Sequence, residues 1–284
     1  MEHKNNVHSQ NGEDGIIQKI LQCLPQKDQW CVEFGAWDGR HLSNTYHLIE
    51  SHAYSAVLIE GDSGKFHELT QNNRDRGGVI CMNAFVGFQR TDGLDALLHK
   101  TTIPQNFDVL SIDIDGNDHH VWSVVEEYRP KVVCIEFNPT IPVDVQFVQA
   151  ASPVITQGAS LRSLVELGKQ KKYELVAVTL TNALFVDAAY FPLLEIADNR
   201  PEVLWTERPM VTYLFNGYDG TVFLRGHRGL GWHPIAFEEY RFQVLPSALR
   251  TYPGNYRWYQ RKMLALYVQA QRVRKRLRRL FGIN

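Results

Sequence analysis

The sequence predicts an α/β fold built on one mainly parallel β-sheet. Two observations indicate it: apolar runs recur along the first half of the chain, and stretches with helical periodicity separate them. The chain has 284 residues, of which 44% are apolar and 21% charged, so it is long enough for one large core and short for two ordinary domains. This composition excludes disorder as the main state.

The predicted strands are continuous apolar runs, as expected when helices cover both faces of a parallel sheet. Five of them cover residues 30–34, 55–59, 79–82, 109–112 and 132–135. Two more, at 174–179 and 184–186, are so near in sequence that we expect an antiparallel pair at the sheet edge. Predicted helices cover residues 14–24, 64–74, 121–128 and 160–171.

Composition divides the chain into a predicted domain at residues 1–187, an irregular appendage at 188–256 and a basic amphipathic helix at 257–284. From Arg257 onward there are nine basic residues and no acidic ones, which leaves 21 basic and 31 acidic residues before it. Apolar residues recur among these charges at Leu264, Val268, Val273, Leu277, Leu280 and Phe281. Such a helix can lie on an anionic membrane, dock on an acidic protein or pack on its own domain. Nucleic acid is disfavoured, because the rest of the chain offers no basic, aromatic-interleaved platform.

The cysteines and the hydropathy indicate the compartment. Cys23, Cys31, Cys81 and Cys134 lie far apart without zinc-type spacing, and we expect free, mostly buried thiols. The chain shows no long apolar span and no apolar stretch at its N-terminus. We therefore expect a cytoplasmic protein, which the basic helix can hold peripherally at the inner face of the membrane.

The ends of the first three strands have the residues of a nucleotide site. Residues 33–39 are EFGAWDG, in which Gly35 and Gly39 allow a tight turn and close approach of a ligand to the backbone. The spacing is not GxGxxG, which disfavours an NAD-type oxidoreductase. Glu60 ends the second strand, about 20 residues after the glycine turn, where an acid accepts hydrogen bonds from ribose hydroxyls. Asn83 and Ala84 follow the third strand and can contact an adenine.

Four segments occur in a shared order: SQNGEDG at 9–15, EFGAWDG at 33–39 with SNT at 43–45, IEGD at 59–62 and LSIDIDGND at 110–118. In these motifs the chain resembles the FkbM-like branch of class I S-adenosylmethionine-dependent methyltransferases. The resemblance implies a seven-stranded Rossmann-like sheet with a terminal antiparallel hairpin, within residues 9–187. The chain departs from it at Ser111, where many members have Lys, and at Asp115, where Glu is frequent, which makes the substrate class less secure.

The motifs and the resemblance together give the candidate cofactor-binding residues. They are Gln10, Glu33, Gly35, Ala36, Asp38, Gly39, Asn44, Glu60, Gly61, Asp62, Asn83, Ala84 and Asp113.

Acidic and amide side chains follow the fourth and fifth strands. Neighbouring parallel strands would bring these oxygens together, and such ligands suit Mg²⁺ or another divalent cation. The predicted metal ligands are Asp113, Asp115, Glu136 and Asn138. The arrangement looks like that of metal-dependent sugar and catechol O-methyltransferases. A metal-free site, with a carboxylate as general base, is the alternative.

A metal that held two vicinal hydroxyls would lower the pKa of one of them and align its oxygen with the methyl group. Asp115, His119 and His120 are the catalytic candidates, although adjacent histidines at a helix start can equally be capping or surface groups. The predicted substrate contacts are Asp118 and, from the appendage, His227, Trp232 and His233. With the loop 139–158 they should cover this end of the sheet, or else pack as a small lid.

These inferences lead to one function and one rival. The leading hypothesis is an S-adenosylmethionine-dependent O-methyltransferase that acts on a sugar hydroxyl of a glycan or glycosylated small molecule, with assistance by a divalent metal left open. The alternative is a non-catalytic nucleotide-binding scaffold or accessory protein that docks through the basic helix. Homo-oligomerisation is left open.

Overall fold

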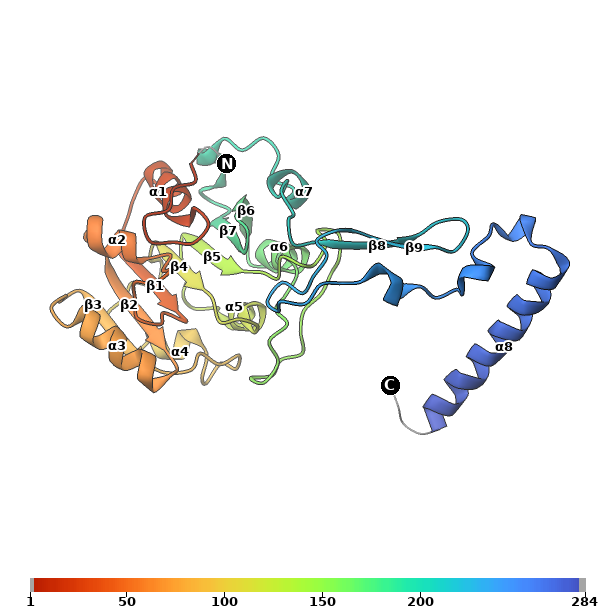
Figure 1. The fold of residues 1–284 in the computed structure, drawn as a ribbon. Helices are drawn as coiled ribbons and strands as arrows, with labels where there is room; N and C mark the ends of the chain where they lie inside the picture. Colours follow the sequence, from red (N-terminus) through yellow and green to blue (C-terminus); the bar gives the residue numbers. More distant parts are fainter. Residues whose placement is uncertain (1–2, 281–284) are drawn as a thin grey trace. The chain divides into compact units, whose positions relative to one another are not determined.

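The computed structural model describes residues 3–280 and contains a seven-stranded sheet (Figure 1). Its strands are β1 (Trp30–Phe34), β2 (Ser55–Glu60), β3 (Val79–Asn83), β4 (Val109–Ile112), β5 (Val132–Glu136), β6 (Tyr173–Val178) and β7 (Asn182–Asp187). Their order is β3-β2-β1-β4-β5-β7-β6, and β7 runs antiparallel to both of its neighbours. The predicted α/β class, the seven strands and the antiparallel terminal pair are confirmed.

Six helices accompany the sheet: α1 (Glu13–Cys23), α2 (Tyr46–Ser51), α3 (Ser63–Asn73), α4 (Leu94–Leu98), α5 (Asp118–Val124) and α6 (Leu161–Gln170). Side-chain caps define two of their starts. Asp62 accepts hydrogen bonds from the backbone amides of Gly64 and Lys65 at α3, and Ser160 accepts one from Ser163 at α6. The short helices α2 and α4 were not among the predicted ranges, because five or six residues give too little periodicity.

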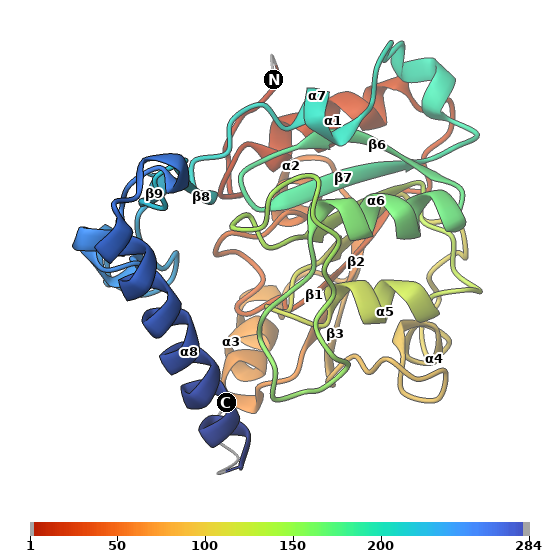
Figure 2. The same ribbon diagram turned by 90° about the vertical axis from the view of Figure 1, so that its right-hand side faces the viewer.

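The helices cover both faces of the sheet. On one face, α1, α2 and α3 pack on a core that includes Cys31, Leu58 and Cys134. On the other face, Trp122 of α5 lies against Phe185 of β7, with 5.0 Å between ring centroids. The helices α5 and α6 lie side by side there (Figure 2). All four cysteines are free thiols, as predicted.

The chain divides into two compact units, Met1–Arg208 and Pro209–Asn284. The sheet unit thus continues past residue 187 through a 3₁₀ helix at Phe191–Leu194 and through α7 (Pro201–Leu204). Trp205 accounts for this extension, because its buried indole packs against Phe137 with 5.1 Å between ring centroids. Residues 188–208, which the sequence assigned to the appendage, are therefore part of the sheet unit.

The second unit contains a hairpin and the basic helix. Strands β8 (Thr212–Asn216) and β9 (Val222–Gly226) are antiparallel, and the turn between them uses Gly220 at φ 81°. The sequence predicted only irregular structure here. Short 3₁₀ helices lead into α8 (Trp258–Leu280), and residues 281–284 of the predicted helix lie outside the described residues. Within residues 3–280, no helix is long and apolar enough to cross a membrane.

A buried ion pair closes the amino end of the sheet. The carboxylate of Asp108 has no exposed surface and accepts hydrogen bonds from the backbone amides of Asp28 and Gln29, each at 3.0 Å, and from the Tyr54 hydroxyl at 2.9 Å. The Lys131 ammonium, 3% exposed, lies 2.7 Å from the same carboxylate. The same ammonium also pairs with the carboxylate of Asp28 at 2.5 Å, so Lys131 bridges two acids at this end of the sheet.

We expect Asp108→Asn to lower the free energy of unfolding by about 3 to 5 kcal/mol, because it removes one partner of a buried ion pair. Urea denaturation of the variant and of the exposed control Asp75→Asn measures the effect. Equal unfolding free energies for the two variants would contradict it.

Candidate active site

The turns that follow the parallel strands lie at the carboxyl edge of the sheet. The strand order reverses there between β1 and β4. The turn after β1 contains Gly35 at φ 73°. A Cβ atom there would lie 1.9 Å from the backbone carbonyl oxygen of Asp113, the residue that follows β4. Only glycine fits this approach, so the predicted cofactor turn lies directly against the predicted metal-binding segment.

Glu60 joins the first two turns. Its carboxylate accepts one hydrogen bond from the backbone amide of Trp37 and one from that of Asp62, both at 2.8 Å. A carboxylate has about four acceptor positions, so further hydrogen bonds can form there. Asp62 itself caps α3, and Asp38 accepts hydrogen bonds from the backbone amides of Arg40 and His41. The carboxylates of Asp38 and Asp62 thus shape the loops around Glu60.

Glu33 holds the next segment. Its carboxylate, 5% exposed, accepts hydrogen bonds from the Ser43 hydroxyl at 2.5 Å, the Asn44 backbone amide at 2.9 Å and the Thr45 hydroxyl at 2.7 Å. Burial raises its pKa. The structure therefore gives Glu33 an anchoring role that the sequence prediction, as a direct cofactor ligand, did not include.

Ser111, at which the chain departs from the FkbM-like pattern, forms a hydrogen bond with Asn44. The Asn44 side-chain amide donates to the Ser111 hydroxyl at 3.1 Å, and both side chains are buried. Asn44, a predicted cofactor residue, is thereby tied to β4.

Two exposed aromatic rings lie near Glu60, and the sequence reasoning missed both. The Phe85 ring, 82% exposed, lies so close to Gly61 that a Cβ atom there would be 2.3 Å from it. Trp37, 43% exposed, has the Lys65 ammonium 4.4 Å from its ring centroid. The signal available in the sequence was an aromatic residue just after a strand end.

The other predicted cofactor residues have backbone or local roles. The Asn83 side-chain amide donates to the carbonyl of Glu60 at 2.8 Å, and the Ala84 amide donates to the same oxygen at 3.1 Å. The Ala36 amide donates to the carbonyl of Ile59, and Gly39 has φ 74°. Gln10 is exposed.

The segment 9–15 instead places Asp14 in the interior. One oxygen of this carboxylate accepts hydrogen bonds from the backbone amides of Val7, His8 and Ser9 at 2.7–2.9 Å. The other oxygen, Oδ1, is buried without a partner among the described residues. The sequence reasoning did not select Asp14, although it quoted the motif that contains it.

Three of the predicted metal ligands form one cluster. Oxygen atoms of Asp113, Asp115 and Glu136 all lie within 4.8 Å of one another, and Asp115 has φ 56° in the loop after β4. Asn138 differs, because its amide oxygen accepts hydrogen bonds from the backbone and hydroxyl of Thr140 at 2.9 and 2.7 Å. The amide is engaged by the loop that follows β5, which leaves three carboxylates as the candidate ligands.

Burial and mutual repulsion shift the pKa values of this carboxylate cluster. Burial raises the pKa of Asp113 to about 8, with the charges of Asp118 and Asp115 adding to the shift. Burial likewise raises the pKa of Glu136 to about 10, and the charge of Asp113 contributes next. A proton or a cation relieves this repulsion.

Asp118 supports the loop that presents Asp115. Its two oxygens accept hydrogen bonds from the backbone amides of Ile114 at 3.0 Å and Gly116 at 2.9 Å. The side chain is 2% exposed, and burial raises its pKa to about 6. With both oxygens engaged, Asp118 holds this loop in place, and its predicted contact with substrate stays a prediction.

The two histidines do not join the carboxylate cluster. His120 Nε2 lies 2.8 Å from the carbonyl oxygen of Gln149 in the loop 139–158. His119 lines a separate open hollow of about 450 Å³ beside α5 and α6, and burial lowers its pKa to about 4. The catalytic role of His119 and His120 therefore stays a prediction.

The loop 139–158 is tied to the loop that carries Asp115. The buried Gln149 side chain donates to Asn117 Oδ1 at 3.1 Å and accepts hydrogen bonds from the backbone amides of Gln157 and Gly158. Asn117 donates in turn to the carbonyl of Ser152 at 2.9 Å. The predicted covering by His227, Trp232 and His233, which lie in the second unit, stays a prediction.

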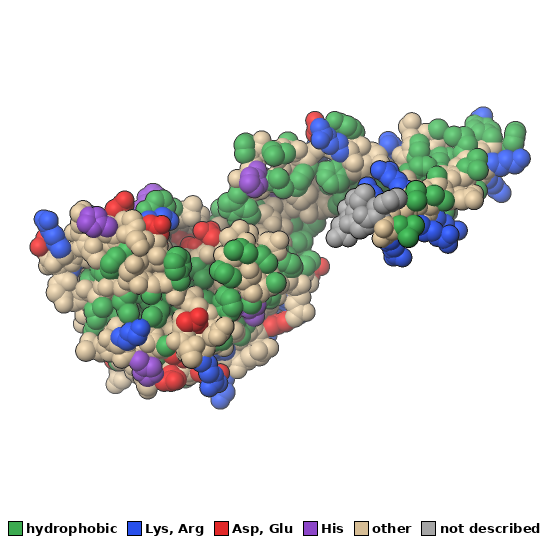
Figure 3. Space-filling view, turned by 90° about the horizontal axis from the view of Figure 1, so that it is seen from below, with side chains coloured by type: hydrophobic (Ala, Val, Ile, Leu, Met, Phe, Trp, Pro, Cys, Tyr) green, Lys and Arg blue, Asp and Glu red, His purple; other side chains and the backbone are tan. Residues whose placement is uncertain are grey.

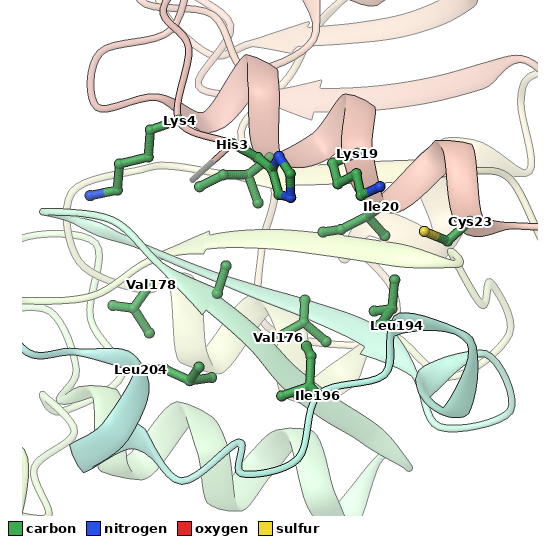
Figure 4. Close-up of a pocket in the computed structure, with 12 residues that line it drawn as sticks. His3, Lys4, Lys19, Ile20, Cys23, Val176, Val178, Leu194, Ile196 and Leu204 are labelled. Atoms are coloured by element: carbon green, nitrogen blue, oxygen red, sulfur yellow. The ribbon is translucent and has the colours of Figure 1, made fainter. Parts of the chain in front are cut away.

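A mostly apolar cavity of about 280 Å³ lies apart from these residues (Figure 4). It is formed by α1, β6 and the segment 194–204, with Ile20, Val176 and Leu194 among its lining side chains. None of the predicted site residues lines it.

Neither a protein-family model nor a curated protein matches the sequence. Solved structures match it at low identity. M. capricolum TrmK in complex with S-adenosyl-homocysteine is 8% identical over 61% of this chain and 67% of that chain, with a TM-score of 0.38. The N-terminal domain of EvdMO1 with S-adenosyl-homocysteine bound is 10% identical over 64% and 84%, with a TM-score of 0.40. The CurJ carbon methyltransferase is 8% identical over 62% and 52%, with a TM-score of 0.42.

The strand order with an antiparallel β7 is the Rossmann-like methyltransferase fold. The finer FkbM-like resemblance stays a prediction.

The shifted carboxylates predict a pH dependence of stability. In the metal-free protein, native Asp113 and Glu136 hold protons that the unfolded chain has already lost, so raising the pH favours unfolding. His119 has the opposite effect, but only below its unfolded value of 6.5. The free energy of unfolding should therefore fall from about pH 6.5 to about pH 8 as Asp113 loses its proton, and should continue to fall to about pH 10 as Glu136 loses its own.

Urea denaturation in EDTA across this range measures the slope, which should be smaller in Asp113→Asn and unchanged in the exposed control Asp75→Asn. A slope in Asp113→Asn as steep as in the wild type would refute the assignment.

Proposed function

We propose that the protein is an S-adenosylmethionine-dependent O-methyltransferase that modifies a sugar hydroxyl of a glycan or glycosylated small molecule. A bound divalent cation would assist the reaction. The observation that carries the proposal is the three-carboxylate cluster of Asp113, Asp115 and Glu136, placed directly against the Gly35 turn of a methyltransferase-type sheet. The cluster and the turn would bring an acceptor hydroxyl and a methyl donor together.

The residues around the first two turns fit S-adenosylmethionine. Glu60 has acceptor capacity for ribose hydroxyls, and the exposed rings of Phe85 and Trp37 offer planes for an adenine. Asp14 lies near enough to Glu33 of β1 for its charge to raise the pKa of that carboxyl, and its Oδ1, unpartnered among the described residues, fits an ammonium group. When bound, S-adenosylmethionine supplies a methyl group on a positively charged sulfur.

The carboxylate cluster fits a hard divalent cation such as Mg²⁺, which binds through one or two carboxylates and keeps positions for water or substrate oxygens. The cation would lower the pKa of a coordinated hydroxyl. Vicinal hydroxyls, which sugars provide, can fill two neighbouring positions, and this supports the proposed acceptor class.

The proposed transfer is a displacement at carbon. The acceptor oxygen forms a bond to the methyl carbon, the carbon–sulfur bond breaks, and its electron pair stays on sulfur in the neutral product S-adenosylhomocysteine. The hydroxyl proton passes to a carboxylate, for which Asp115 is suited because it is exposed and its loop is held by Asp118. Positioning supplies much of the acceleration.

Calorimetric titration with S-adenosylmethionine and S-adenosylhomocysteine tests donor binding. The wild type should bind both ligands, and Glu60→Ala should weaken binding by about tenfold or more because a charge-assisted hydrogen bond contributes about 1.5 to 3 kcal/mol. The control Glu68→Gln, an exposed acid on α3, should bind as the wild type does.

Absence of binding in a folded wild type would contradict the enzyme proposal and favour the non-catalytic scaffold. Undiminished binding by Glu60→Ala would remove only the assigned role of Glu60.

Thermal unfolding with added Mg²⁺ tests the cation without any activity assay. We expect Mg²⁺ to raise the melting temperature of the wild type, with stabilisation of about 2.7 kcal/mol at a hundredfold excess over the dissociation constant. Asp115→Asn, which removes one ligand at an exposed position, should show a smaller rise, and the exposed control Glu127→Gln should show the full one. An equal rise in all three proteins would argue against a cation in the cluster and leave the metal-free general-base mechanism.

A further inference from the structure

The helix α8 has a continuous apolar seam that nothing in its own unit covers. The seam residues are spaced alternately four and three positions apart, which places them on one side of a helix. They are Tyr259, Met263, Leu266, Ala270, Val273, Leu277 and Leu280. All seven are exposed, with Leu266 at 67% and Leu280 at 79%.

A different side of α8 attaches the helix to its own unit. Gln260 donates a side-chain hydrogen bond to the carbonyl of Ala248 at 3.0 Å, and the Tyr267 hydroxyl donates to the carbonyl of Val244. Gln260, Leu264 and Tyr267 are the half-buried residues of the helix. The attachment therefore leaves the seam open over the whole length of α8.

The charge of α8 has one sign. The helix contains eight Lys and Arg residues and no Asp or Glu. Figure 3 shows Lys and Arg side chains beside hydrophobic ones on this part of the chain. An apolar stripe bordered by cations matches a surface that presents anionic headgroups above acyl chains.

The same charges disfavour a second copy as the partner. Arg274 and Arg276 border the seam on its two sides next to Val273 and Leu277. In a coiled coil of two such helices these positions face each other, and here they would bring like charges together without an acid to pair them.

We propose that α8 binds peripherally to an anionic membrane, with its seam among the acyl chains and its Lys and Arg side chains among the headgroups. A helix in this position lies along the interface and does not cross it, in agreement with the hydropathy of α8. The proposal does not depend on methyl transfer.

Co-sedimentation of the full chain with vesicles tests it. The protein should bind vesicles of equimolar phosphatidylglycerol and phosphatidylcholine, should not bind pure phosphatidylcholine, and should be released as salt is raised. The seam variant Leu266→Gln with Leu277→Gln should weaken binding by about tenfold or more, because two exposed leucines lose their apolar burial.

Val268→Gln is the matched control, since Val268 is 40% exposed on the side of α8 opposite the seam, and it should bind as the wild type does. Failure of the wild type to bind the anionic vesicles would overturn the proposal, as would equal binding to both vesicle types or full binding by the seam variant. Light scattering that shows a dimer in the wild type and a monomer in the seam variant would instead assign the seam to a second copy and also overturn it.

Discussion

The close approach between Gly35 and the carbonyl of Asp113 is the constraint on which the site depends. Parallel pairing of β1 with β4 fixes the two strand ends side by side, and the missing side chain lets their turns touch. The Glu60 carboxylate then ties the β1 turn to the β2 turn, and Glu33 ties β1 to the segment before α2. The backbone around the proposed donor site is therefore held by contacts from three strands, β1, β2 and β4.

The two ends of the sheet handle buried charge in opposite ways. At the amino end, the buried carboxylate of Asp108 is paired with the ammonium of Lys131. At the carboxyl end, the main charges that shift the pKa of Asp113 and Glu136 belong to other carboxylates. Uncompensated repulsion is costly for folding, and its retention at one end is typical of functional sites.

The sequence correctly predicted the features that depend on local residue patterns. Continuous apolar runs indicated every strand of the seven-stranded sheet, but not β8 and β9 of the second unit. The acids at the ends of β4 and β5 indicated the carboxylate cluster, because parallel neighbours end at one edge. The sequence could not show which way each side chain at this edge points. His120 pairs with the carbonyl of Gln149 and His119 lines a separate hollow, because α5 begins at Asp118. Gln149 meets Asn117 only through a contact across 32 positions of sequence. The sequence reasoning missed Phe85 and Asp14 because their significance depends on the residues that surround them in the folded chain.

The spacing of the α8 seam also limits its length. A strict seven-residue repeat drifts by about 20° per repeat around a straight helix, which amounts to about 60° over the three repeats from Tyr259 to Leu280. A stripe that turns this little still presents one side to a flat surface. A helix twice as long with the same repeat would need a supercoiled partner to keep its stripe covered, so the length of α8 suits a planar surface.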